Sequence, residues 1–170
     1  MTFYIASLTV EHCQQLCQWR YPSPYEIYQW PAWGDMMKEQ REFADPLIQE
    51  TQYTAVLDDE SELVGFAQFF PMEGVTRLGL GLRPNLCNGG QGEHFVNVII
   101  EEALRRTPSN EIDLEVMTWN LRAQNVYEKA GFVVTDTYER NTPTGRCEFH
   151  CMVYRAGANE TNQLVEFKEE

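Results

Sequence analysis

Hydrophobic and polar positions follow two different periods along this chain. Alternation with a period of two predicts strands at residues 3–8, 52–58, 62–70, 75–82, 111–119, 133–140 and 146–155. Apolar residues spaced three and four apart predict helices at 9–19, at about 35–50, after Gly92 and at 120–130. We therefore expect an α/β fold with a mixed sheet of about seven strands and about four flanking helices.

Local signals set the limits of several of these elements. Thr9 and Asn120 stand where helix N-caps are expected, and Gly131 stands where a left-handed C-cap is expected. The second helix should end near Pro46, because proline interrupts a helix. The acidic residues 58–61 read as the turn of a hairpin. Residues 1–156 are predicted to form one domain, and residues 157–170 a polar, acidic tail.

The predicted strand 75–82 places small residues where a strand usually carries large ones. Leu78, Leu80 and Leu82 fall on one face, and Arg77, Gly79 and Gly81 on the other. Glycine inside a strand often marks close approach by a ligand or by another backbone. A thin, extended ligand with amide groups, such as a pantetheine arm, would fit there.

The charge balance narrows the classes of partner. The 170 residues include 26 acidic and 13 basic side chains, for a formal charge of -13. This balance argues against nucleic acid and against an anionic membrane surface, and it suits a cationic partner. No apolar run approaches the ~20 residues of a membrane-spanning helix.

The cysteine pattern favours a reducing compartment. Five cysteines, an odd number, and an N-terminus that does not resemble a secretory leader predict a cytoplasmic protein with reduced thiols. The pairs Cys13/Cys17 and Cys147/Cys151 could together supply a four-thiolate zinc site. We expect no metal, because cysteines at such spacings usually pack as small apolar residues.

A glycine-rich segment, residues 87–92, runs directly into a predicted helix. It lacks the Lys and Ser/Thr of a P-loop, and Phe95 stands where a dinucleotide fingerprint has its third glycine. Two interpretations remain: a turn without a ligand, or a pyrophosphate loop that binds through main-chain N–H groups and the helix dipole.

Two motifs together resemble the GNAT superfamily of N-acetyltransferases. The family's acetyl-CoA loop has the pattern R/Q-x-x-G-x-G/A, and here it reads CNGGQG, with Cys87 in place of Arg or Gln. The second motif, NLRAQNVYEKAGF, follows about 30 residues later and contains the Asn and the Y-E-K-x-G-F ending of the family. The resemblance covers nearly the whole chain to about Arg155.

The resemblance implies an acetyl-CoA-dependent N-acetyltransferase that acts by direct attack of a primary amine within a ternary complex. It implies that the cofactor is contacted by the following residues: Leu80, Gly81 and Leu82 at pantetheine; Cys87, Asn88, Gly89, Gly90, Gln91 and Gly92 at the pyrophosphate; and Asn120 and Tyr127 near the thioester. Tyr127 would protonate the departing thiolate, although a core position would also explain it. Glu93 must turn outward, because its charge lies at the helix end that faces phosphate.

The acceptor side is less determined. Glu73 and Glu115 are candidate bases, with a water relay as the alternative, and Glu115 would otherwise face solvent. Five aromatic residues are candidates for the acceptor pocket or for plain packing: Tyr21, Tyr25, Tyr28, Trp30 and Trp33. The expected acceptor is a small-molecule amine or a peptide, and a homodimer is a further candidate assembly. Two alternatives stay open: Cys87 as a covalent nucleophile, and a catalytically silent acyl-CoA-binding or regulatory domain.

Overall fold

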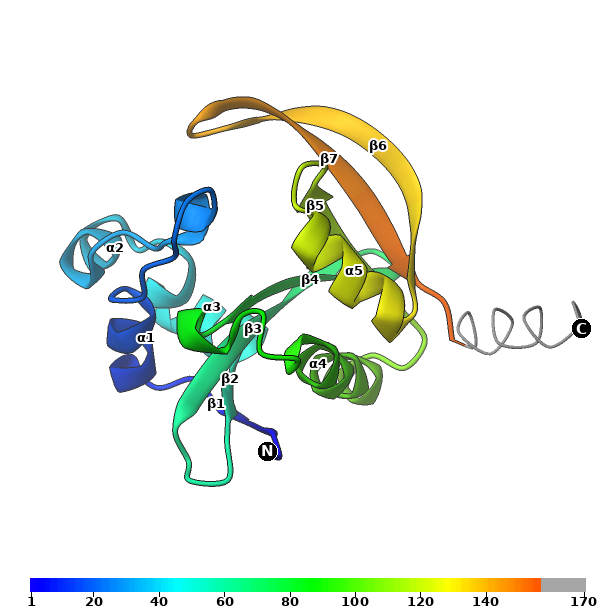
Figure 1. The fold of residues 1–170 in the computed structure, drawn as a ribbon. Coiled ribbons are helices and arrows are strands. Elements are labelled where there is room, and N and C mark those ends of the chain that lie inside the picture. Colours follow the sequence, from blue (N-terminus) through cyan, green and yellow to red (C-terminus); the bar gives the residue numbers. More distant parts are fainter. Residues whose placement is uncertain (157–170) are drawn as a thin grey trace, which may run out of the picture.

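The structure, a computed structural model that describes residues 1–156, is built on one seven-stranded sheet in the order β1-β2-β3-β4-β5-β7-β6 (Figure 1). The strands are β1 (Tyr4–Ser7), β2 (Tyr53–Leu57), β3 (Leu63–Met72), β4 (Val75–Leu82), β5 (Glu111–Met117), β6 (Phe132–Thr142) and β7 (Gly145–Tyr154). Only the β4–β5 pair is parallel. The predicted mixed sheet and its seven strands are confirmed. The proposed tail, residues 157–170, lies outside the described residues.

Within residues 1–156, five α-helices flank the sheet, where we expected about four. They are α1 (Val10–Leu16), α2 (Trp33–Glu39), α3 (Pro46–Gln52), α4 (Gly92–Arg106) and α5 (Leu121–Ala130). The single helix predicted over 35–50 is wrong. Gln40 ends α2 in the left-handed conformation, and Pro46 is the first residue of α3 rather than its end. Proline suits this first position because its N–H would have no partner there, and Asp45 caps the N–H groups of Leu47 and Ile48.

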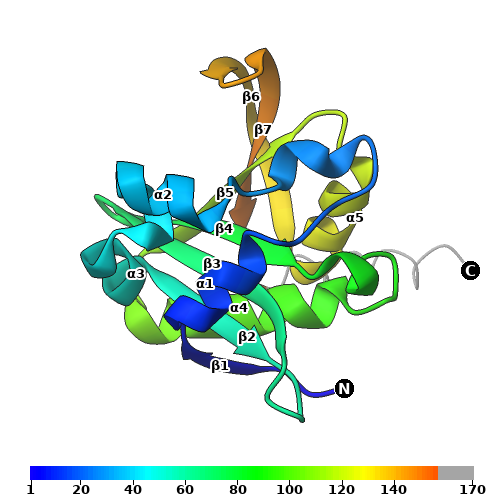
Figure 2. The same ribbon diagram turned by 90° about the vertical axis from the view of Figure 1, so that its left-hand side faces the viewer.

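The helices divide between the two faces of the sheet. Helices α1, α2 and α3 cover one face of β1 to β4, and α4 and α5 pack on the opposite face (Figure 2). The core on the α4 side is larger and is centred on Phe95, Ile99, Leu114 and Phe132. The strands β6 and β7 form a long hairpin that curves out beyond the rest of the sheet (Figure 1).

Two glycines let β3 and β4 approach their neighbours closely. A Cβ built on Gly65 would lie 2.4 Å from the ring of Phe95 and 2.7 Å from the carbonyl oxygen of Gly81. A Cβ on Gly81 would lie 2.4 Å from the ring of Phe66. The glycines of this part of the sheet therefore serve the packing of strands and helices as well as any ligand.

The caps of α1 and α5 are those predicted. Thr9 accepts a hydrogen bond from the N–H of His12, and Asn120 accepts one from the N–H of Ala123. Gly131 ends α5 with φ of 110°. Within residues 1–156, none of the helices combines the length and the apolar character that crossing a bilayer requires.

Candidate active site

The sheet opens between β4 and β5. These strands pair from Val75 opposite Glu111 to Leu78 opposite Leu114, and no further pairing joins them. Beyond Leu78 their ends diverge around a cavity of about 400 Å³. The cavity is lined by Leu80 and Gly81 on one strand and by Glu115 and Val116 on the other. The divergence leaves one edge of β4 free to bond a ligand through its main chain.

The glycine-rich segment and the start of α4 close one end of this cavity. Cys87, Asn88, Gly90 and Gly92 line it, whereas Gly89 and Gln91 do not. Gly90 has φ of 79°, a conformation that favours glycine. Gln91 occupies the N-cap position of α4, but its side chain accepts no N–H of the first turn. The first N–H groups of the helix are thus left for an external acceptor, and an anion is the natural one.

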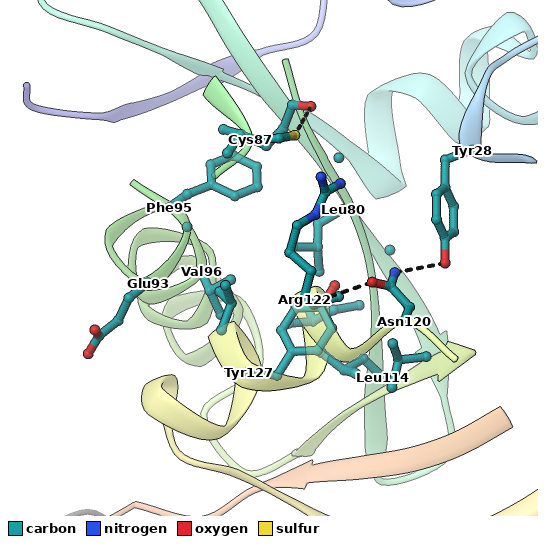
Figure 3. A pocket seen from close by; sticks show the side chains of 18 of the residues that line it. Tyr28, Leu80, Cys87, Glu93, Phe95, Val96, Leu114, Asn120, Arg122 and Tyr127 are labelled. Atoms are coloured by element: carbon teal, nitrogen blue, oxygen red, sulfur yellow. Dashed lines mark hydrogen bonds between the residues drawn. The ribbon is translucent and has the colours of Figure 1, made fainter. Parts of the chain in front are cut away.

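Helix α5 forms a second wall. Asn120 is buried and bridges two elements, because its Oδ1 accepts the N–H of Ala123 and its Nδ2 donates to the hydroxyl of Tyr28 at 2.9 Å. Tyr127 lines the cavity, and its ring lies 6.0 Å from that of Phe132 (Figure 3). Burial, with the nearby Tyr28 hydroxyl, raises the pKa of Tyr127, so this phenol stays protonated at neutral pH.

Residues 21–28, which we call the strap, lie beside the cavity, and Tyr21 and Tyr28 at its two ends line it. The hydroxyl of Tyr21 donates to the carbonyl oxygen of Leu82 at 2.7 Å, and Tyr28 bonds Asn120 as described. Tyr25 packs against Trp119, with ring centroids 5.7 Å apart. The strap therefore joins the end of β4 to the start of α5, and it occupies the Leu82 carbonyl that we expected to meet pantetheine.

Three of the five aromatic candidates for the acceptor pocket, Tyr25, Trp30 and Trp33, do not line the cavity. Trp30 packs on Phe43 and Phe66 at 4.8 and 5.8 Å, and Trp33 stacks on Phe43 at 6.3 Å. Both belong to the smaller core beneath α1 and α2, which corrects their assignment. Tyr21 and Tyr28 line the cavity. Tyr25 contacts Trp119 and the guanidinium of Arg122, and Arg122 lines the cavity.

The two candidate bases lie in different surroundings. Glu73 is exposed in the turn between β3 and β4 and does not line the cavity, so the structure gives it no place at the site. Glu115 lines the cavity, but the expectation that it faces solvent is wrong: its side chain is 13% exposed. It accepts hydrogen bonds from Arg77 at 3.3 Å and from the hydroxyl of Tyr138 at 2.5 Å. Both of its oxygens are therefore engaged.

Comparison with known proteins assigns the chain to a family. The sequence model described as Acetyltransferase (GNAT) family matches residues 13–132. The chain belongs to the GNAT family. No curated protein gave a significant match in sequence.

Solved structures share the GNAT fold at low sequence identity. An aminoglycoside acetyltransferase, AAC(6')-Ib, in complex with coenzyme A is 23% identical, with 95% of this chain and 99% of that chain covered and a TM-score of 0.69. Spermidine N-acetyltransferase from Vibrio cholerae in complex with CoA and spermine is 16% identical, with 89% and 94% covered and a TM-score of 0.65. A chimera of the Vibrio cholerae enzyme and hSSAT is 14% identical, with 91% and 95% covered and a TM-score of 0.70.

Compared with the GNAT loop pattern, the most distinctive feature of this site is a thiol at position 87, where the pattern has Arg or Gln. The thiol of Cys87 donates to the carbonyl oxygens of Leu82 and Arg83, at 3.8 and 3.7 Å. Burial raises its pKa, while the charge of Arg122 opposes that rise. Glu93 is exposed and also lines the cavity, and its carboxylate points away from the other labelled side chains (Figure 3).

Arg122 and Trp119 are among the residues at or beside the cavity that sequence reasoning did not single out. Arg122 lines the cavity from the first turn of α5, and Trp119 packs on the strap. Both flank Asn120, so their closeness to a predicted cofactor residue was the available signal.

The cysteine pairs do not converge on a metal site. Cys13 and Cys17 lie in the smaller core, and Cys147 and Cys151 lie on β7. Among residues 1–156, no three His, Cys, Asp or Glu side chains are grouped so as to hold a metal ion.

Proposed function

We propose that this protein is an N-acetyltransferase that moves the acetyl group of acetyl-CoA to a primary amine of a small molecule. The observation that carries the proposal is the opening between β4 and β5, which ends on the uncapped start of α4. The free edge of β4 suits the amides of pantetheine, and the start of α4 suits a diphosphate. Structural neighbours with the same fold are titled as acetyltransferases in complex with CoA.

The residues present fit the roles that this reaction requires. Acetyl-CoA supplies a thioester, and the reaction forms a bond from the amine nitrogen to the carbonyl carbon while the carbon–sulfur bond breaks. Main-chain N–H groups along the free edge of β4 would stabilise the charge that develops on the carbonyl oxygen. Tyr127, which burial keeps protonated, would donate to the departing sulfur.

The proton lost by the amine passes to water in this proposal. A lysine-like amine has a pKa of about 10.4 and must lose a proton before it can attack. Glu73 lies outside the cavity, and both oxygens of Glu115 already accept hydrogen bonds. Water in the cavity is therefore the remaining route for the proton.

The acceptor is proposed to be a small, cationic amine. The structural neighbours include an acetyltransferase in complex with spermine and another in complex with ribostamycin. The formal charge of -13 of this chain also suits a cationic molecule. A basic peptide is the second candidate. Tyr28 of the strap lines the cavity and is still 40% exposed, so its ring offers a larger acceptor a contact outside the cavity.

Calorimetric titration with acetyl-CoA, followed by an assay for released thiol, tests the proposal. We expect binding, and thiol release in the presence of spermine or ribostamycin. Absence of binding at millimolar acetyl-CoA would contradict the cofactor assignment. Binding without thiol release, across polyamines, aminoglycosides and basic peptides, would instead support the catalytically silent acyl-CoA-binding domain.

A further inference from the structure

Arg122 is held in a defined position at the cavity. Its guanidinium carbon lies 3.6 Å from the centroid of the Tyr25 ring, and Tyr25 packs in turn against Trp119. The side chain rises from α5 toward the strand that carries Leu80 and toward Cys87 (Figure 3). A stacked guanidinium is bound through its flat face, so its N–H groups at the edge stay available for a ligand.

The glycine-rich segment opposite Arg122, residues 87–92, carries no cationic side chain. Cys87 is a neutral thiol that donates to two carbonyl groups of its own segment. The field of Arg122 reaches this thiol, where it lowers the pKa against the effect of burial. An anion placed between the start of α4 and Cys87 would therefore lie within the field of the guanidinium.

We propose that Arg122 binds the diphosphate of acetyl-CoA and supplies, from α5, the positive charge that is absent at position 87. Tyr25 is the positioning residue that orients the guanidinium. This inference rests on the proposed function, because it names a residue that recognises the cofactor of that reaction. A guanidinium offers a planar fork of donors that matches phosphate oxygens, and the N–H groups at the start of α4 would bind from the other side.

Lys129 is the competing candidate, since it also lines the cavity. It lies seven residues after Arg122, in the last turn of α5. At about 1.5 Å per residue, the two Cα atoms are separated by roughly 10 Å along the helix. The two side chains therefore address different parts of a bound molecule, and separate substitutions can distinguish them.

The test compares CoA with dephospho-CoA, which keeps the diphosphate but lacks the 3′-phosphate, and with pantetheine, which lacks the whole nucleotide half. Calorimetry measures the affinity of all three for the wild type, Arg122→Gln, Lys129→Gln and the control Arg83→Gln. Arg83 carries the same charge next to the loop, but it bonds Asn85 and the carbonyl of Leu63 and does not line the cavity. We expect Arg122→Gln to weaken CoA and dephospho-CoA alike, by about tenfold or more, with pantetheine and the control unchanged. A loss for CoA but not for dephospho-CoA would assign Arg122 to the 3′-phosphate and overturn this inference.

A double variant that moves the positive charge from position 122 to position 87 sharpens the test. Cys87→Arg added to Arg122→Gln should recover most of the lost CoA affinity, because it returns a cation to the loop. Tyr25→Leu should weaken CoA by a smaller factor, because Arg122 is then less ordered. Melting temperatures of all variants confirm that each remains folded.

Each result supports or overturns the proposal. An equal loss for CoA and pantetheine would mean that Arg122 only stabilises the strap, and a loss confined to Lys129→Gln would place the diphosphate elsewhere. Unchanged CoA affinity in Arg122→Gln would also overturn this inference and leave the proposed function intact. If the wild type does not bind CoA, the proposed function fails, and this inference fails with it.

Discussion

Replacing Glu115 with glutamine separates a structural role of this carboxylate from a role as the general base. Its side chain is 13% exposed and accepts hydrogen bonds from Arg77 and Tyr138, while Arg140 lies 3.5 Å away. Glutamine keeps the shape and one acceptor oxygen but removes the charge. Asp113 keeps its ion pair with Arg77 at 2.9 Å, so no cation is left buried alone.

The magnitude follows from these contacts. A hydrogen bond to a charged group is worth about 1 kcal/mol more than a neutral one, and two such bonds are weakened. The Arg140 contact adds little, because that side chain is 51% exposed. We expect a loss of about 1–2 kcal/mol in the free energy of unfolding, or roughly 2–8 °C in melting temperature for a chain of this size.

Two measurements on the same protein decide between the roles. Urea unfolding gives the stability, and thiol release at saturating acetyl-CoA and amine gives kcat. The control is Glu148→Gln, the same chemical change at an exposed position of β7. We expect kcat of Glu115→Gln within about threefold of the wild type, since general base catalysis would contribute about a hundredfold or more. A hundredfold drop in kcat with unchanged stability would refute this reasoning and make Glu115 the base.

Three further predictions follow from the same structure. Tyr127→Phe should lower kcat by about a hundredfold with little change in the affinity for CoA, measured by thiol release and calorimetry; an unchanged kcat would return Tyr127 to the core. Gly65→Ala should cost about 1–3 kcal/mol in urea unfolding because its Cβ meets Phe95, whereas Gly34→Ala, with open space around it, should not destabilise α2. Arg105, with Arg106, holds the pKa of Glu102 below its ordinary 4.5, so Glu102→Gln should flatten the fall in stability as pH drops below about 4.5.

The pH dependence of stability that we predict for Glu102 has a defined sign. A carboxylate with a lowered folded pKa stabilises the protein above its unfolded pKa, and that contribution is lost as the pH falls through the folded pKa. Urea midpoints between pH 3 and 7 would show it. A wild-type curve that matches the Glu102→Gln curve over this range would show that the ion pairs with Arg105 and Arg106 contribute nothing measurable.

Hydrophobic periodicity and capping residues predicted most of the strands and helices, because these signals depend only on residues close together in the sequence. Alternation in 75–82 and 111–119 located β4 and β5, and Asn120 and Gly131 located the ends of α5. The helix predicted over 35–50 failed because a proline can begin a helix as well as end one, and only the cap at Asp45 distinguishes the two cases.

Parts of the site depend on tertiary placement and were beyond sequence reasoning. Leu80 and Gly81, with the glycine-rich segment, were found because glycine spacing and a motif mark them. Trp30 and Trp33 share the aromatic character of Tyr21 and Tyr28, yet they face the smaller core, and composition does not reveal which face an aromatic takes. Arg122 lies near enough to Cys87 to oppose the rise in the pKa of its thiol only because α5 packs beside α4.

The position of β7 in the sheet has a consequence for synthesis of the protein. Strand β7 lies between β5 and β6, so the second half of the sheet cannot close until residues 145–154 have left the ribosome. Phe149 of this strand also lines the cavity. A nascent chain that already displays the glycine-rich segment and α5 would therefore lack a wall of the cavity, and the acetyl-CoA binding that we propose should appear only after β7 has been translated.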